Sequence, residues 1–182
     1  MEIKFTIPNK GLNGKTLVAF EKLLYNGAQI ATHEDIEDKD QSVHKLLIST
    51  LATGEDGQSK LVDAKKSVTV KDKVTYENIV LGDEYKVVGS LVDKSTSKEV
   101  SKTELKYTPK EAKGDFVVEF KNVDLTKYAG KTLVAFESLK RDKIELVTHA
   151  DINDEDQSVY LPKIKTTLSS DKGLKSALAS EK

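Results

Sequence analysis

An internal repeat constrains this chain more than any other feature. The stretch KTLVAFESLKRDKIELVTHADINDEDQSV at 131–159 has a counterpart, KTLVAFEKLLYNGAQIATHEDIEDKDQSV, at 15–43. The copies align without a gap at a spacing of 116 residues, which is the period of a domain rather than of a short motif. A chain of 182 residues holds one complete unit of that size and parts of two others. We therefore expect the C-terminal part of a preceding repeat at 1–46, a complete domain at 47–161, and the first strand and loop of a following repeat at 162–182.

The complete unit consists of short segments with strand patterns, separated by polar turns. The expected strands are 46–53, 67–80, 84–94, 103–109, 115–120, 131–139 and 144–150. Many short strands at about ten-residue spacing are typical of an immunoglobulin-like antiparallel β-sandwich. The alternating stretch EIKFTI at 2–7 predicts a further strand, and only 109–113 and 124–129 are expected to be briefly helical. The sequence thus predicts an all-β, CnaB-like sandwich in tandem repeats.

Composition excludes several classes of function. The 29 basic and 30 acidic residues give a net charge of −1, and Arg141 is the only arginine, so neither nucleic acid nor an anionic membrane is an expected partner. No apolar run is long enough to span a membrane, and no signal peptide is visible. Because the N-terminus aligns with the interior of the second copy, we expect the chain to begin within a unit, and the missing signal then says little about location.

Three side chains recur at the same spacing in both copies and could carry chemistry. They are Glu137, His149 and Gln157 in the second copy, and Glu21, His33 and Gln41 in the first. In an antiparallel hairpin, cross-strand neighbours lie about 4.5–5.5 Å apart, so such positions can converge. A histidine beside an acid and a carboxamide supplies a base, a polarising group and an electrophile.

Two further polar residues lie on expected strands of the complete unit. Thr50 lies on its first strand, and Thr166 has the same place in the following repeat. Asp72 interrupts an alternating apolar strand, where an acid is costly to bury unless it is paired. A threonine hydroxyl beside a histidine is a potential nucleophile.

These motifs together resemble a known family. LVAFE, THxDIxDxxQSV, a preceding IxT strand and VxDxVTYENIVLGDEYxVxGxLxDK look like the VaFE repeat of Gram-positive surface proteins. That repeat is similar to immunoglobulin-like stalk domains that form an internal threonine–glutamine ester. The resemblance covers essentially the whole chain. It implies a structural module of a cell-wall-anchored, extracellular adhesin, with neighbouring repeats as partners and a host-surface ligand at a distant tip domain.

The resemblance also implies a role for each residue. Thr50 would attack the side-chain carbonyl of Gln157, and His149 would take the hydroxyl proton. Glu137 and Asp72 would orient the histidine and polarise the carboxamide. The reaction is a single self-catalysed event without turnover, and it needs no cofactor or metal. Glu21, His33, Gln41 and Thr166 would belong to incomplete sites in the flanking repeats.

Several alternatives compete with this interpretation. A related cross-link could join a lysine to Asn78 or Asn122, and Thr53 is a second hydroxyl on the first strand. The sandwich could be a ligand-binding module or a hydrolase, although no G-x-S-x-G motif occurs. The acidic turn at 151–156 resembles a calcium loop, but its sixth residue is not glycine, and a solvated turn is expected. Thr166 of one chain could also meet Gln41 of another and give head-to-tail polymers.

Overall fold

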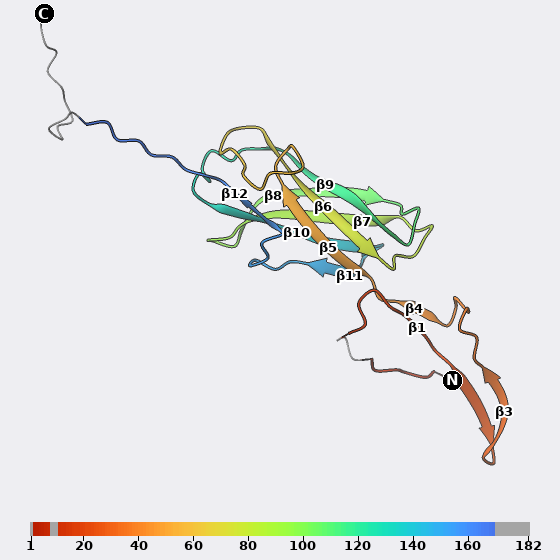
Figure 1. The fold of residues 1–182 in the computed structure, drawn as a ribbon. Coiled ribbons are helices and arrows are strands. Elements are labelled where there is room, and N and C mark those ends of the chain that lie inside the picture. Colours follow the sequence, from red (N-terminus) through yellow and green to blue (C-terminus); the bar gives the residue numbers. More distant parts are fainter. Residues whose placement is uncertain (1, 8–10, 170–182) are drawn as a thin grey trace, which may run out of the picture.

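The structure, a computed structural model, describes residues 2–7 and 11–169. Its regular elements are strands, and they confirm the predicted all-β antiparallel sandwich. One sheet has the order β5 (Leu47–Thr53), β6 (Val68–Glu77) and β9 (Lys113–Val123). The other has the order β11 (Ile144–His149), β10 (Thr132–Arg141), β7 (Tyr85–Asp93) and β8 (Lys98–Tyr107), and β12 (Ser158–Tyr160) pairs with β10. The first strand of the sandwich, β5, lies beside its last two strands, β11 and β12 (Figure 1).

The core forms between the inner faces of these two sheets. On β6, alternate side chains are buried, and Asp72 belongs to the same buried face as Val70 and Val74. On β10, the core-facing residues Leu133 and Ala135 are followed at the same spacing by Glu137. Two acids therefore occupy positions where the period-two pattern of a strand would otherwise place apolar residues.

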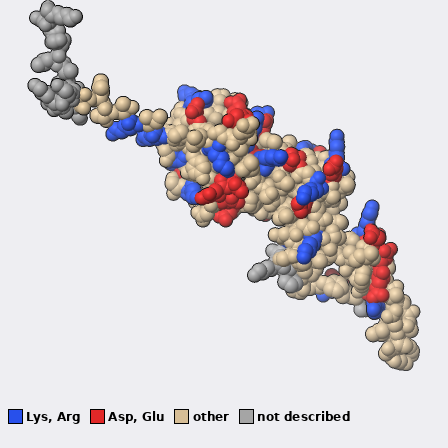
Figure 2. Space-filling model, viewed as in Figure 1, with Lys and Arg blue, Asp and Glu red and all other residues tan. Residues whose placement is uncertain are grey.

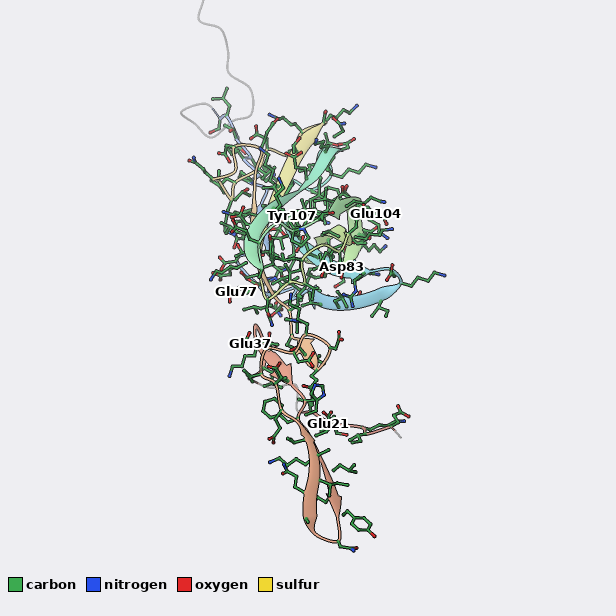
Figure 3. All side chains as sticks on the ribbon, turned by 90° about the vertical axis from the view of Figure 1, so that its right-hand side faces the viewer. Glu21, Glu37, Glu77, Asp83, Glu104 and Tyr107 are labelled. Carbon is green, nitrogen blue, oxygen red and sulfur yellow. The ribbon has the colours of Figure 1, made fainter. Side chains whose placement is uncertain are left out.

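The N-terminal part of the chain forms two small antiparallel pairs outside the sandwich. β1 (Thr16–Val18) pairs with β4 (Ser42–His44), and β2 (Glu21–Tyr25) pairs with β3 (Ala28–His33). Figure 3 places Glu21 in this region, beyond the sandwich that carries Tyr107. At the junction, the hydroxyl of Thr16 donates to Oδ1 of Asn78 at 3.1 Å.

Three local predictions were wrong. Residues 109–112 form a bend and 124–129 a loop with turns, because β9 already begins at Lys113 and because the Asp124 carboxylate binds the amide of Thr126 at 3.1 Å. Residues 2–7 form no strand and are exposed, since the described residues offer them no neighbouring strand equivalent to β6. Residues 162–169 are likewise exposed and extended without pairing, and the rest of that predicted strand and loop lies outside the described residues.

The surface carries both signs of charge. Figure 2 shows lysines and acids interspersed over the visible face of the sandwich. Ion pairs such as Lys86–Glu104 and Lys73–Asp115 are half exposed, so each contributes little to stability. Over residues 2–7 and 11–169, no helix is long and apolar enough to cross a membrane.

Candidate functional site

The site lies between the two sheets, at the edge where the first strand meets the last. Thr50 on β5 and Asp72 on β6 come from one sheet, and Glu137 on β10 and His149 on β11 come from the other. Gln157 immediately precedes β12. Asp72 and Gln157 are completely buried, and Thr50 and Glu137 are nearly so. The structure therefore brings together the five residues predicted for the cross-link.

Strand register explains this convergence. Glu137 and His149 are directly opposite each other on β10 and β11. Asp72 is opposite Ala52, so Thr50, two residues earlier on β5, is its diagonal neighbour on the same face. The backbone of Gln157 is fixed on the other side, because its carbonyl accepts a hydrogen bond from the amide of Ala135 at 2.8 Å. Backbone hydrogen bonds between strands thus fix the positions of all five residues, and only their side-chain torsions are left to be set.

His149 uses both ring nitrogens. Its Nδ1 lies 3.2 Å from Oγ1 of Thr50, and its Nε2 lies 3.3 Å from Oδ2 of Asp154. A carboxylate beside Nε2 favours the tautomer with the proton on that nitrogen, which leaves Nδ1 free to accept the hydroxyl proton of Thr50. A hydroxyl, an imidazole and a carboxylate in this order are the arrangement that activates a hydroxyl nucleophile.

The carboxamide of Gln157 is held at both ends. Its Nε2 donates to the backbone carbonyl of His149 at 3.0 Å, and its Oε1 accepts from the backbone amide of Asp151 at 3.1 Å. The amide of Asp151 is a fixed donor at the oxygen where negative charge develops when a nucleophile adds to the carbonyl. Thr50 therefore contacts the ring of His149, and Gln157 contacts the backbone carbonyl of the same residue.

Asp72 and Glu137 form a buried pair of carboxyl groups. None of their four oxygens accepts a well-formed hydrogen bond from an N–H or O–H donor. The two groups act on each other, with the Thr50 hydroxyl next to Asp72 and the Gln157 carboxamide next to Glu137. Burial raises the pKa of both, and burial together with the neighbouring Asp72 raises the pKa of Glu137 to about 11. At neutral pH, Glu137 is therefore protonated and can donate a hydrogen bond.

Asp154 is the member of the site that the sequence analysis missed. We expected Glu137 and Asp72 to orient the histidine, but the carboxylate at the second ring nitrogen belongs to Asp154. The repeat contained the signal, because Asp38 has the same place five residues after His33. In the structure, Nε2 of His33 lies 3.0 Å from Oδ2 of Asp38.

The structure brings together three of the residues predicted for the flanking sites. Glu21 is opposite His33, and Nε2 of Gln41 donates to Oε2 of Glu21 at 2.8 Å. The counterparts of Thr50 and Asp72 would precede residue 1 in the repeat alignment. Thr166 lies in the exposed segment after β12.

The alternative acceptors and nucleophiles have other contacts. Oγ1 of Thr53 donates to the backbone carbonyl of Lys71 at 3.5 Å. Oδ1 of Asn78 accepts from Thr16, and Oδ1 of Asn122 accepts from the hydroxyl of Ser67 at 3.0 Å. Both of these carboxamide oxygens thus already accept a hydrogen bond from a hydroxyl group.

The acidic turn stabilises its own backbone. The carboxylates of Asp151 and Asp154 accept hydrogen bonds from the amides of Asn153 and Asp156 at 2.9 and 2.8 Å. Within the described part of the chain, no cluster of three or more histidine and carboxylate side chains is arranged to hold a metal ion. Asp and Asn commonly close turns in this way, and this explains why the turn is acidic.

Comparison with known proteins identifies a family and an adhesin of similar fold. Residues 1–45 and 47–161 match the T-Q ester bond containing domain. Two crystal forms of a bacterial adhesin from Mobiluncus mulieris, containing intramolecular disulfide, isopeptide and ester bond cross-links, have a similar fold. Their TM-scores are 0.53 and 0.54 at 20% and 19% identity, over 65% of this chain and 58% and 57% of theirs. The aligned part is thus under two-thirds of the adhesin chain, and no curated protein sequence gives a significant match.

Proposed function

This chain belongs to the family of T-Q ester bond containing domains, and on that premise we propose that it is a stalk module hardened by an ester between Thr50 and Gln157. The observation that carries the proposal is the pair of contacts on His149. Its Nδ1 faces the Thr50 hydroxyl at 3.2 Å, while its carbonyl holds the Gln157 carboxamide at 3.0 Å. The nucleophile and the electrophile are thereby fixed on one residue, which gives them a high effective concentration.

The proposed reaction begins at the threonine. His149 Nδ1 takes the hydroxyl proton as Thr50 Oγ1 bonds to the side-chain carbonyl carbon of Gln157, and Asp154 stabilises the imidazolium that forms. Negative charge develops on Gln157 Oε1, where the amide of Asp151 already donates. The protonated carboxyl of Glu137 lies beside the carboxamide and can supply a second donor to it.

Collapse of this intermediate releases ammonia. The proton held by His149 passes to the Gln157 nitrogen, the carbon–nitrogen bond breaks, and an ester remains between Thr50 and Gln157. One hydroxyl proton is transferred to the leaving amide group, so the reaction needs no further reactant. The reaction occurs once for each molecule and supplies a covalent bond rather than turnover.

The covalent bond would join the first strand of the sandwich to the segment before its last. In the chain-entropy model, closing a loop of about 100 residues stabilises the fold by about 4.7 kcal/mol. Tension applied at both ends of the unit would load this bond instead of the hydrogen bonds between β5 and its neighbours. Such a bond would suit a mechanical role in a repetitive stalk.

We place this module in a cell-surface adhesin of a Gram-positive bacterium, anchored to the cell wall. The fold neighbour is an adhesin with an ester cross-link, and this supports the placement. In this proposal, 47–161 is the complete repeat, 1–46 and 162–182 belong to its neighbours, and a host-surface ligand binds at a distant tip domain.

Intact mass tests the cross-link directly. We expect the purified wild-type chain to be lighter than its sequence mass by one ammonia, and Thr50→Ala to have the full mass. Thr53→Ala is the matched control, because Thr53 is also a buried threonine on β5 but donates to the Lys71 backbone, so this variant should still lose ammonia. A wild-type chain of full mass, or a deficit that survives Thr50→Ala, would contradict the proposal.

A further inference from the structure

A lysine outside the proposed reaction lies among four backbone carbonyls. Nζ of Lys60 donates to the carbonyls of Glu155 and Asp156 at 2.8 and 2.9 Å, and it lies 3.3 and 3.4 Å from those of Ser158 and Ala52. An ammonium group has three protons, so the two short contacts and one shared longer contact use its full donor capacity. Several carbonyl dipoles directed at one point repel one another unless a cation lies between them.

These carbonyls belong to residues that lie close in sequence to Thr50 and Gln157. Glu155 and Asp156 immediately precede Gln157, and Ser158 immediately follows it. Ala52 lies two residues beyond Thr50 on the same face of β5, and its amide donates to the carbonyl of Asp156 at 2.8 Å. The ammonium thus joins the strand of the nucleophile to both sides of the acceptor.

The backbone of Lys60 is fixed beside the same segment. Its carbonyl accepts from the amide of Tyr160 at 2.8 Å, and the amide of Val62 donates to the carbonyl of Tyr160 at 2.9 Å. Leu61 and Tyr160 form a parallel bridge at this point. The side chain therefore extends from a loop that is already paired with β12, and it needs little further ordering to reach the turn.

We propose that Lys60 is a positioning residue for the Thr50–Gln157 reaction, acting as a built-in cation that holds the acceptor turn against β5. The inference depends on the proposed cross-link. Lys60 touches no reacting atom, so it acts through the backbone on either side of Gln157. The turn carries four acidic side chains, Asp151, Asp154, Glu155 and Asp156, whose charge the ammonium partly offsets.

The rate of ammonia loss tests this role. The full chain is made by cell-free synthesis, samples are denatured at intervals, and the cross-linked fraction is read from intact mass. We expect Lys60→Met, which keeps length but removes charge, to slow cross-linking about 10- to 100-fold, because small displacements of reacting groups reduce rates by this order. Lys60→Arg restores a cation that can bind the same carbonyls and should recover most of the rate.

A matched lysine provides the control. Nζ of Lys71 donates to a single backbone carbonyl, that of Glu55 at 2.7 Å, on the far side of the same loop. Lys71→Met should cross-link within about twofold of wild type, as expected for a surface contact. Adding either change to Thr50→Ala, which cannot react, shows whether unfolding alone explains a slower rate, and we expect both double variants to remain folded under the conditions of the rate measurement.

Each outcome separates the two proposals. A wild-type chain that never loses ammonia overturns the cross-link and this inference together. If the wild type cross-links and Lys60→Met reacts as fast as Lys71→Met, only the role of Lys60 is overturned. A slow Lys60→Arg, or a Lys60→Met rate loss matched by unfolding in the Thr50→Ala background, also overturns it, because the lysine would then be a structural contact.

Discussion

The two copies of the acceptor hairpin share their local geometry and differ in their surroundings. Glu21 is opposite His33 as Glu137 is opposite His149, and both hairpins have a register shift at the same place. The histidine meets the aspartate of the following turn in both copies. Yet the His33 side chain is 61% exposed, whereas that of His149 is 26% exposed.

The glutamines differ more than the histidines. In the complete unit, Gln157 directs its oxygen to the backbone amide of Asp151. In the N-terminal copy, Gln41 donates to Glu21 at 2.8 Å, and its oxygen is buried without a hydrogen-bond partner among the described residues. The hairpin sequence is thus sufficient for the histidine–aspartate contact, but strands β5 and β6 and the Lys60 loop surround only the acceptor of the complete unit.

Replacing the two histidines separately should have the largest effect. His149→Ala removes the proposed base, so we expect it to abolish ammonia loss, while His33→Ala should leave the cross-link intact because the Thr50 hydroxyl contacts His149 and the His33 ring contacts Asp38. Without the ester, the unfolding free energy should fall by about 4.7 kcal/mol in the chain-entropy model. Intact mass and urea unfolding measure the two effects.

The N-terminal copy of the hairpin provides the control for these two substitutions. If His33→Ala also prevented ammonia loss, the N-terminal hairpin would take part in the reaction, and the distinction between a complete and an incomplete site would be wrong. A His149→Ala chain that still lost ammonia would contradict the role of the base.

Replacing the aspartates of the two turns should give the same contrast between the copies, with a smaller effect on the rate of cross-linking. Asp154→Asn keeps the shape of the contact with Nε2 of His149 and removes the charge that stabilises the imidazolium. We expect it to slow cross-linking about 10²- to 10⁴-fold, by analogy with the loss of the carboxylate in hydrolase triads. Asp38→Asn should not change the rate, and equal rates for the two variants would contradict a catalytic function for this contact.

The sequence predicted the site better than it predicted the ends of the chain. Strand periodicity placed Val70, Asp72 and Val74 on one face of β6, and the structure buries that face. The repeat and the resemblance together identified five residues that the strands bring into one site. Position along a strand determines which face a side chain occupies, and the resemblance supplied the assignment of roles that spacing alone left open.

The errors concern features that depend on distant partners. The alternation of 2–7 is that of a strand, but a strand forms only where a neighbour supplies hydrogen bonds. Asp154 was missed because its turn was attributed to solvent, and only the folded hairpin shows its carboxylate next to His149. Spacing alone did not distinguish a turn-closing aspartate from one that also orients a base.

The carboxyl pair should make the unreacted domain sensitive to alkali. In the folded state, Glu137 keeps its proton up to a pKa of about 11, while in the unfolded chain it loses the proton near 4.5. The contribution of Glu137 to the unfolding free energy of Thr50→Ala should therefore be greatest below about pH 4.5 and fall between these values, by at most about 1.4 kcal/mol per pH unit. Urea unfolding at several pH values measures this slope.

Replacing Glu137 isolates its contribution to the pH dependence of stability. Glu137→Gln in the Thr50→Ala background cannot lose a proton, so its stability should vary less with pH above neutrality. Glu21→Gln, the matched change in the N-terminal copy, should leave the slope as it was. A slope unchanged by Glu137→Gln would show that the buried pair does not retain a proton at neutral pH.

The smallest of these effects concerns the space around Glu137, which only the complete unit provides. Gly89 on β7 is directly opposite Glu137, and a Cβ added there would lie 2.8 Å from Cγ1 of Val118 and 3.0 Å from the Phe120 ring. Gly89→Ala should therefore force the sheets apart and reduce the stability of the Thr50→Ala chain by about 1–3 kcal/mol. Gly54→Ala is the control, because an added Cβ would come no closer than 3.4 Å to any neighbour. If Gly89→Ala were as stable as Gly54→Ala, the sheets would yield easily at this point, and close sheet packing could not be what keeps water from Glu137.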